Sequence, residues 1–245
     1  MGDVSQHYEL LLAEHYTWMA GMPYDDKVAE QQALLESLGI RPHTTGIALD
    51  LGSGPGFQSI ALAKLGFARV VAIDTSRFLL DELLAAKGDL PIEVVHADLN
   101  DVPKIIGPAG ADAIVCMGDT LTHLAHPREV SRLFANAFAA LAPGGRLVLS
   151  FRDLTVELTG VDRFLPVRAD RDRIMTCVLD YEPDSVIVTD LIHERTGETW
   201  NLHKSSYRKL RLDPAVVMAE LVELGFAVRR HQPEGRLCIL AATKP

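Results

Sequence analysis

The chain has 245 residues, of which 48% are hydrophobic and 23% are charged, so it has the composition of a globular protein that can bury a sizeable core. Its formal net charge of −9 repels polyanions, which disfavours a nucleic-acid partner. Cys116, Cys177 and Cys238 stand far apart, with no CxxC or Cys/His cluster. This spacing argues against a disulfide framework or a structural zinc site, and we predict no bound metal.

The first 40 residues predict a helical cap. Tyr8, Leu11 and His15 recur at helical spacing, Pro23 interrupts the pattern, and Gly39 is placed to end a second helix. The first residues lack the basic start and clean apolar run of a signal peptide. No apolar stretch in the sequence is long enough to span a membrane. We therefore expect a cytoplasmic protein with no membrane partner.

Residues 41–152 alternate between strand and helix patterns. Crossover connections of this kind predict a parallel sheet with helices on both faces, a Rossmann-like doubly wound α/β fold. The strands are expected at 47–51, 70–74, 91–96, 113–116 and 146–151, with helices at 58–65, 77–87 and 127–141 and a turn at 143–145.

The pattern changes after residue 152. Three strands at 174–181, 186–193 and 200–210, separated by turn signals, predict an antiparallel β-meander inserted over residues 153–211. Asp213 and Pro214 then mark the start of a helix, and a hairpin closes the segment 212–245. We expect one domain over residues 1–245, with the cap at 1–40 and the core at 41–152.

A glycine-rich turn joins the first strand to the first core helix and lets a ligand approach the backbone closely. Gly52, Gly54 and Gly56 form a GxGxG pattern, whereas the dinucleotide fingerprint is GxGxxG and would need glycine at Phe57. Asp50 precedes the loop, where an acid repels phosphates and attracts an ammonium group. The pattern therefore argues against NAD.

Two further acids end neighbouring strands. Asp74 stands 18 residues after Gly56, close to the spacing expected for an acid that binds ribose hydroxyls. Asp98 follows the third strand. Because ligands bind outside the carboxyl ends of parallel strands, Asp50, Asp74 and Asp98 are expected at one edge of the sheet.

These motifs, in the order ALDLGSGPG, VVAIDTS, HADLND, DAIVCMGDTLTHL and LAPGGRLVLS, resemble class I S-adenosylmethionine-dependent methyltransferases over residues 45–152. The resemblance implies S-adenosyl-L-methionine as cofactor. It places Asp50, Gly52, Gly54 and Gly56 at the methionine part, Asp74 with the adjacent Thr75 at the ribose, Asp98 and Leu99 at the adenine, and Cys116, Met117 and Gly118 at the methyl donor.

A narrower resemblance is to the glycine and glycine/sarcosine N-methyltransferases. It rests on the segment from Gly118 to Leu124 and on Phe151-Arg152-Asp153. It implies that Arg152 binds a substrate carboxylate, for which a guanidinium offers a planar two-donor fork. Asp119 stands where that family has Asn. We predict that Asp119 contacts the acceptor, and it is the candidate to orient or deprotonate it.

Several residues have two interpretations. His123 is either a general base at the substrate or a structural histidine beside the cofactor loop. Tyr16 and Trp18 either contact substrate and cofactor, respectively, or pack in the helical cap. Tyr207 and Lys209 are interpreted as a solvated strand face, and residues 170–173 as a solvated turn.

We expect methyl transfer to a small molecule, with the nitrogen of a small amine or amino acid as acceptor. The alternatives are O-methylation of a small acid or alcohol, and a module that binds S-adenosylmethionine without turnover. Alignment of the acceptor with the methyl group is the main requirement of this reaction, so a strong base is not essential. The sequence leaves the oligomeric state open, a homo-oligomer included.

Overall fold

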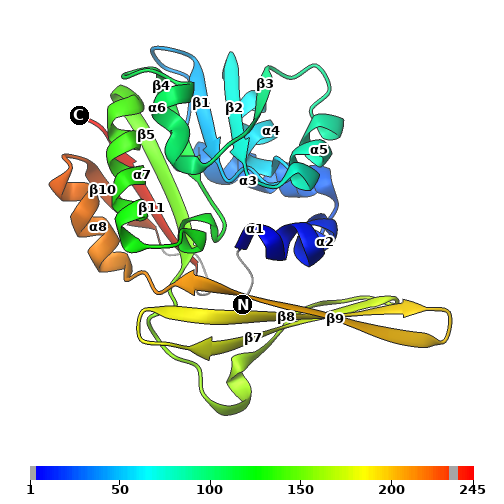
Figure 1. Cartoon of the computed structure of the whole chain (residues 1–245). Helices are drawn as coiled ribbons and strands as arrows, with labels where there is room; N and C mark the ends of the chain where they lie inside the picture. The colour runs from blue at the N-terminus through cyan, green and yellow to red at the C-terminus, as the bar shows by residue number, and fades with distance from the viewer. Residues whose placement is uncertain (1–3, 232–236) are drawn as a thin grey trace.

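The computed structural model describes residues 4–231 and 237–245. Its larger sheet has the strand order β10-β11-β5-β4-β1-β2-β3 (Figure 1). Strands β1 to β5 are parallel, whereas β11 runs antiparallel to β5 and β10 antiparallel to β11. This confirms the predicted Rossmann-like sheet. The strands are β1 (Ile47–Leu51), β2 (Arg69–Asp74), β3 (Ile92–His96), β4 (Ala111–Cys116), β5 (Leu141–Arg152), β10 (Ala227–His231) and β11 (Leu237–Thr243).

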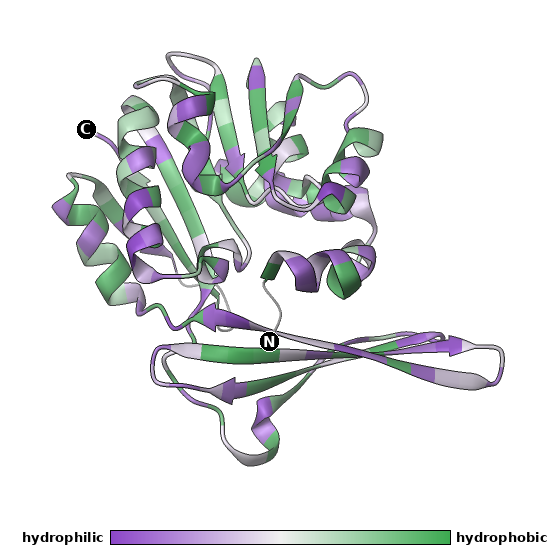
Figure 2. Cartoon of the chain, in the orientation of Figure 1, coloured by the Kyte–Doolittle hydropathy of each residue, from purple (hydrophilic) through white to green (hydrophobic). Residues whose placement is uncertain are grey.

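Helices cover both faces of this sheet, so its central strands are apolar on both sides (Figure 2). All six residues of β4 are buried. One face carries α3 (Tyr24–Ser37), α4 (Phe57–Lys64) and α5 (Arg77–Ala86). The other carries α6 (Val102–Ile105), α7 (Pro127–Ala140) and α8 (Pro214–Glu223). Among the described residues, no helix is long and apolar enough to cross a membrane.

The segment at the start of the chain is helical from Val4 to Met19 but not uniformly α-helical. A π-helical turn, η1 (Tyr8–Leu12), separates α1 (Val4–His7) from α2 (Ala13–Met19). The hydrophobic spacing predicted a helix but could not predict the π-helical turn. Such turns are rare in proteins, and those that occur are often found at functional sites. The end of α3 is as predicted, because Gly39 has φ +74° and its amide donates to the carbonyl of Glu36.

The second sheet is antiparallel, with the order β6-β7-β8-β9. Its strands are β6 (Phe164–Ala169), β7 (Arg173–Tyr181), β8 (Ser185–Thr196) and β9 (Thr199–Leu210). The meander is confirmed, but the sequence predicted three strands and missed β6. The reason is Pro166, which cannot donate to a ladder and is tolerated here because β6 is an edge strand whose register shifts between Pro166 and Arg168.

The interpretation of Tyr207 and Lys209 as a solvated face is wrong. They are only 4% and 7% exposed. The N-terminal helix lies over this face of the small sheet (Figure 1), where Leu11 packs against Met175 and Ile192. A strand pattern shows which residues share a face, but it does not show that a distant helix covers that face.

Strand β5 also differs from its predicted bounds. It begins at Leu141, directly after α7, and includes Pro143, Gly144 and Gly145, which were expected to form a separate turn. The pairing of β5 with β4 shifts register between Ala111 and Ala113, so this stretch is a bulge within the strand.

Candidate active site

A cavity of about 310 Å³ lies at the carboxyl ends of the parallel strands, and the N-terminal helix forms part of its wall. The strand order reverses between the neighbouring strands β1 and β4, and a crevice forms beyond their carboxyl ends at such a point. Each loop that follows β1, β2, β3 or β4 contributes to the wall. The lining residues are Val4, Ser5, Tyr8, Tyr16, Gly52, Gly54, Asp74, Thr75, Ser76, Leu79, Asp98, Leu99, Thr120, His123, Leu124, Ala125 and Glu129.

The glycine loop lets its backbone form the cavity wall. Gly52, Gly54 and Gly56 have φ values of +73°, +53° and +93°, which side chains disfavour. A Cβ on Gly52 would collide with Thr120, and one on Gly56 would collide with Leu83 of α5. Gly56 therefore serves close packing between α4 and α5 and does not line the cavity. A Cβ on Gly54 would lie 3.7 Å from Cε1 of Tyr16, at the cavity wall.

Asp74 ties the glycine loop to the end of β2. Its carboxylate accepts hydrogen bonds from the amides of Gly54 and Ser76, each at 2.8 Å. Burial raises its pKa, against the effect of these bonds. Thr75, Asp98 and Leu99 also line the cavity, and Asp98 accepts from the amide of Asn100 at 2.8 Å. The predicted ribose and adenine residues are thus brought together on one wall.

Other predicted cofactor residues lie away from that wall. Asp50 is 1% exposed and accepts a 2.6 Å hydrogen bond from Ser59 Oγ, and burial raises its pKa to about 7. Met117 is buried behind the wall. Trp18 points toward the small sheet, where its indole donates to Asp170 at 2.6 Å. The turn at 170–173, predicted to be only solvated, therefore also binds the side chain of Trp18.

Aromatic rings surround the opposite end of the cavity. His123 lies on the short helix η3 (Thr120–His123), with the rings of Tyr8 and Tyr207 edge-on at 5.6 and 5.5 Å. Burial lowers the pKa of His123 to about 3, so its ring is neutral at pH 7. No described residue hydrogen-bonds its Nε2. Burial raises the pKa of Tyr16 to about 12, so that hydroxyl remains a donor.

Asp119 lies next to this end of the cavity but does not line it. Its Oδ2 accepts from Lys209 Nζ at 2.7 Å, and its Oδ1 accepts from the Arg152 amide at 3.0 Å. Burial alone would raise the pKa of Asp119, but the charges of Lys209 and Arg152 hold it well below its usual range. Asp119 is thus an ionised partner of Lys209. Because Asp119 does not line the cavity, the structure does not support the predicted contact between Asp119 and the acceptor.

Arg152 is also outside the cavity wall. Its guanidinium is 3.5 Å from Asp119 and its side chain is 57% exposed. A protein carboxylate therefore occupies the partner position that the sequence assigned to a substrate carboxylate. Among the described residues that line the cavity, Asp74, Asp98 and Glu129 are acidic and none is Lys or Arg.

Two residues of this region were missed as site residues. Tyr8 was predicted only as part of a helix, although it stands two turns before Tyr16 and thus on a similar face, a signal that could have paired them. Lys209 is 90 residues from Asp119 in the chain, and no local pattern connects the two.

Residues 48–145 match the family model described as a methyltransferase domain. Glycine/sarcosine N-methyltransferase of Aphanothece halophytica is 30% identical over 116 residues, which cover 46% of this chain and 43% of that protein. Cypemycin N-terminal methyltransferase of Streptomyces sp is 33% identical over 138 residues, covering 56% of this chain and 55% of that protein. The chain spans about half the length of these curated relatives.

Solved structures also resemble this chain over nearly its whole length. Streptomyces venezuelae DesVI has a TM-score of 0.78 and 18% identity, covering 97% of this chain and 100% of that one. CalS10, an amino pentose methyltransferase from Micromonospora echinaspora, has a TM-score of 0.74 and 17% identity, covering 96% and 98%. At these identities the likeness shows the fold alone.

Proposed function

We propose that this chain binds S-adenosylmethionine in the cavity and transfers its methyl group to the nitrogen of a small amine or amino acid. The observation that carries the proposal is the wall formed by Gly52, Gly54, Asp74, Asp98 and Leu99 at the carboxyl edge of the sheet. The resemblance assigns these residues to the methionine, ribose and adenine parts of the cofactor. The match to a methyltransferase domain supports the same assignment.

The chemistry of the wall fits this cofactor. Asp74 offers carboxylate oxygens to the ribose hydroxyls, and Leu99 offers an apolar surface to the adenine. Gly54 leaves space that any larger residue would occupy. When bound, S-adenosylmethionine supplies a methyl carbon on a good, neutral leaving group. The protein's task is then to align the acceptor and to exclude water.

The aromatic end of the cavity is suited to an amine. Tyr8, Tyr16 and His123 present ring faces and edges, and the carboxylate of Glu129 also lines the cavity. Such a wall attracts a cationic amine. A carboxylate would meet acids and no guanidinium or ammonium among the described lining residues, so of the two acceptors this wall favours a small amine over an amino acid. His123 adds a neutral ring to this wall, and its Nε2 is buried between the rings of Tyr8 and Tyr207 rather than exposed to the acceptor.

Two measurements test the proposal. Calorimetric titration is expected to show binding of S-adenosylmethionine and S-adenosylhomocysteine and not of NAD; binding of NAD alone would overturn the cofactor assignment. Labelled S-adenosylmethionine is then offered with a panel of amines, amino acids, hydroxy acids and alcohols. Transfer to alcohols or hydroxy acids in preference to amines would overturn the acceptor assignment while leaving the cofactor assignment intact.

A matched pair of glycine variants links binding to the cavity. Gly54 and Gly88 have nearly the same φ, +53° and +52°, but only Gly54 lies at the cavity, and no atom lies within 4 Å of a Cβ on Gly88. Gly54→Leu is expected to abolish cofactor binding by filling the cavity, whereas Gly88→Leu is expected to keep it. Equal affinities in the two variants would contradict this site.

A further inference from the structure

A second group of potential ligands lies where the N-terminal helix meets the end of the small sheet, away from the cavity. Its centre is His15 on α2, whose side chain is only 3% exposed. Neither ring nitrogen of His15 makes a hydrogen bond with acceptable geometry to any described residue. A buried polar group in this condition is uncommon and costs free energy, so it requires an explanation.

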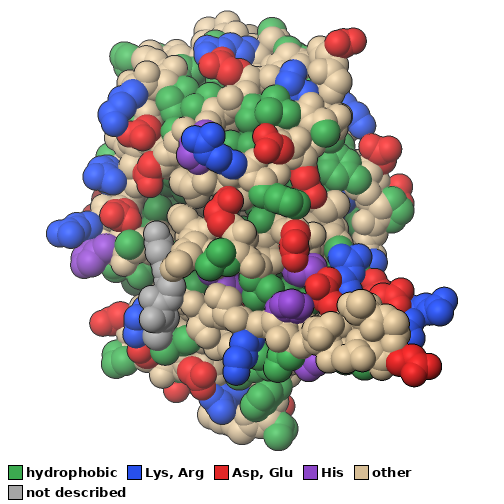
Figure 3. Space-filling model, turned by 45° about the vertical axis from the view of Figure 1, so that its right-hand side comes forward, with side chains coloured by type: hydrophobic (Ala, Val, Ile, Leu, Met, Phe, Trp, Pro, Cys, Tyr) green, Lys and Arg blue, Asp and Glu red, His purple; other side chains and the backbone are tan. Residues whose placement is uncertain are grey.

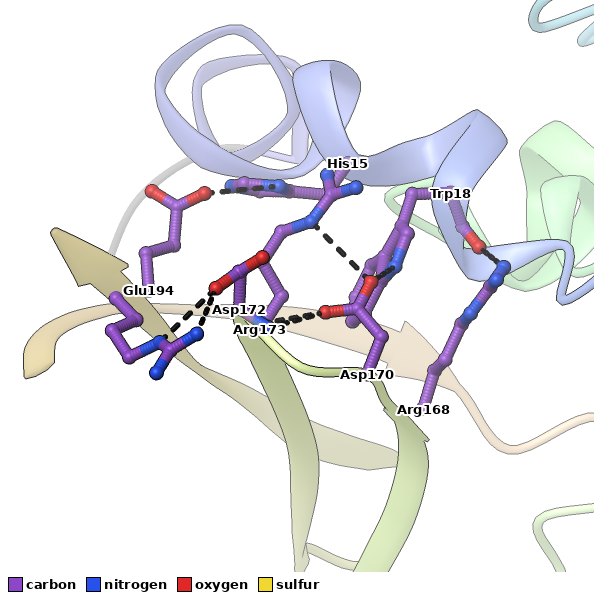
Figure 4. Close-up of polar contacts among 8 residues, drawn as sticks. His15, Trp18, Arg168, Asp170, Asp172, Arg173 and Glu194 are labelled. Carbon is purple, nitrogen blue, oxygen red and sulfur yellow. Dashed lines mark hydrogen bonds and ion pairs between the residues drawn. The ribbon is translucent and has the colours of Figure 1, made fainter. Parts of the chain in front are cut away.

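Carboxylate oxygens lie close to both nitrogens of this ring. Oε1 of Glu14 is 3.2 Å from Nε2, and Oε1 of Glu194, on β8, is 3.9 Å from Nδ1. Figure 4 shows Glu194 directed toward His15 from the small sheet. His203, on β9, places its Nε2 3.7 Å from the other oxygen of Glu194. Donors of Glu14, His15 and Glu194 all lie within 4.8 Å of one another.

The neighbouring basic side chains already have partners. Arg173 is 3.9 Å from Asp170 and lies over the Trp18 ring at 4.6 Å. Arg195 pairs with Asp172 at 2.6 Å. The charges of Glu14 and Glu194 are therefore not cancelled locally, and the group attracts a cation. In Figure 3, acidic, histidine and basic side chains lie together beside the projecting end of the small sheet.

We propose that Glu14, His15, Glu194 and His203 form a binding site for a divalent transition-metal ion of the Zn²⁺ type. Two imidazoles and two carboxylates are the N and O donors that Zn²⁺ takes, and four ligands complete its tetrahedral shell. With bonds of about 2.1 Å, tetrahedral ligand atoms lie roughly 3.4 Å apart. Donor atoms of Glu14, His15 and Glu194 lie within 4.8 Å of one another, and His203 joins this group only through its 3.7 Å contact with Glu194, so side chains must move inward by about 1 Å or more to bind one ion. Glu14 and His203 are 61% and 50% exposed, so their side chains can rotate to close the shell.

Such a site would fasten the N-terminal helix to the small sheet. Glu14 and His15 lie on the helix, whereas Glu194 and His203 lie on β8 and β9. The same helical segment carries Tyr8 and Tyr16 into the cavity wall. A metal bound here is structural: it stabilises the docked position of the helix and does not touch the reacting atoms. The proposal is independent of the methyl acceptor.

The test uses the full chain without a histidine tag, stripped of metal with a chelator. Thermal unfolding is measured with Zn²⁺ and with Mg²⁺, and Co²⁺ is titrated as a spectroscopic probe. We expect Zn²⁺ to raise Tm and Mg²⁺ to leave it unchanged. Co²⁺ is expected to bind once per chain with visible absorption of a tetrahedral site. The rise in Tm follows because binding to the folded state alone stabilises it.

Three variants decide whether these residues are the ligands. Glu194→Gln and His203→Gln change partly exposed side chains, so both variants are expected to fold. Loss of an outer-shell partner already weakens metal binding by about tenfold or more, so loss of a direct ligand is expected to weaken Zn²⁺ binding by at least about tenfold. Glu198→Gln, in the β8–β9 turn, removes the same charge away from the cluster and is expected to bind like the unaltered chain. No Tm rise with Zn²⁺, or equal rises in all three variants, would overturn the proposal.

Discussion

The two ends of the cavity are held in place by different kinds of interaction. At the end lined by the glycine loop, which we propose holds the cofactor and call the cofactor end, acids accept hydrogen bonds from backbone amides that are mostly close in sequence, as Asp74 does from Ser76 and Asp98 from Asn100. At the aromatic end, side chains from the two sheets and the N-terminal helix meet, as Asp119 does with Lys209. His7 and Asp190 form a second such pair at 3.0 Å, and both are buried.

The difference shows which end depends on the whole chain. Strand–loop–helix units form the cofactor end, so their local geometry needs few long-range contacts. The aromatic end exists only when the small sheet and the N-terminal helix are docked on the larger sheet. Substitutions at the aromatic end should therefore affect stability first, and substitutions at the cofactor end should affect ligand affinity first.

Lys209→Met is expected to have the largest effect, a loss of about 3–5 kcal/mol in the free energy of unfolding. It leaves Asp119 charged and buried, because the side chain of Asp119 is only 14% exposed. Urea unfolding measures the loss. Pairing the substitution with Asp119→Asn removes the stranded charge and is expected to restore much of the stability. A double variant no more stable than the single one would contradict this account.

Asp50→Asn is expected to stabilise the protein at pH 8. Because burial raises the folded-state pKa of Asp50 from 3.8 to about 7, the stability linked to its protonated form is present below pH 3.8 and is lost as pH rises through 7. At about 1.4 kcal/mol per pKa unit, the gain reaches up to about 4 kcal/mol. Asn keeps an acceptor for Ser59. Urea unfolding at pH 4 and pH 8 checks this; an equal difference at both pH values would refute it.

Asp74→Ala is expected to weaken binding of S-adenosylmethionine by about 1.5–3 kcal/mol, the range for hydrogen bonds to a charged group. Calorimetric titration measures it. Asp74→Asn serves as the control, since an amide oxygen still accepts from the Gly54 amide and so keeps the loop in place. If the Ala variant folds and binds as tightly as the unaltered chain, Asp74 is not the ribose ligand.

Arg152→Ala is expected to have the smallest effect, about 0.2–1 kcal/mol in stability, because the Arg152 side chain is 57% exposed and Lys209 remains as the closer partner of Asp119. The KM for the acceptor is expected to stay unchanged, since Arg152 is not on the cavity wall. Steady-state kinetics with the best acceptor of the panel checks it. A strong rise in KM would instead restore the carboxylate-binding role that the sequence resemblance implied.

Much of the fold was predictable because its signals are local. The alternation of strand and helix over residues 41–152 and the positions of Asp74 and Asp98 follow from spacing alone. What the sequence could not show are contacts between distant segments. Lys209 meets Asp119 across 90 residues, Trp18 meets Asp170 across 152, and His15 meets Glu194 across 179, so no short window of sequence contains any of these three pairs.

The π-helical turn at Tyr8–Leu12 fixes the rotation of the residues before it relative to those after it. Deleting one residue within it would restore a regular α-helix and rotate everything before it by about 100° around the helix axis. His7 would turn away from Asp190, and Tyr8 would leave His123, while Tyr16 kept its place. The number of residues in this one segment thus determines whether the helix can contact the small sheet through His7 and the cavity through Tyr8 and Tyr16 at the same time.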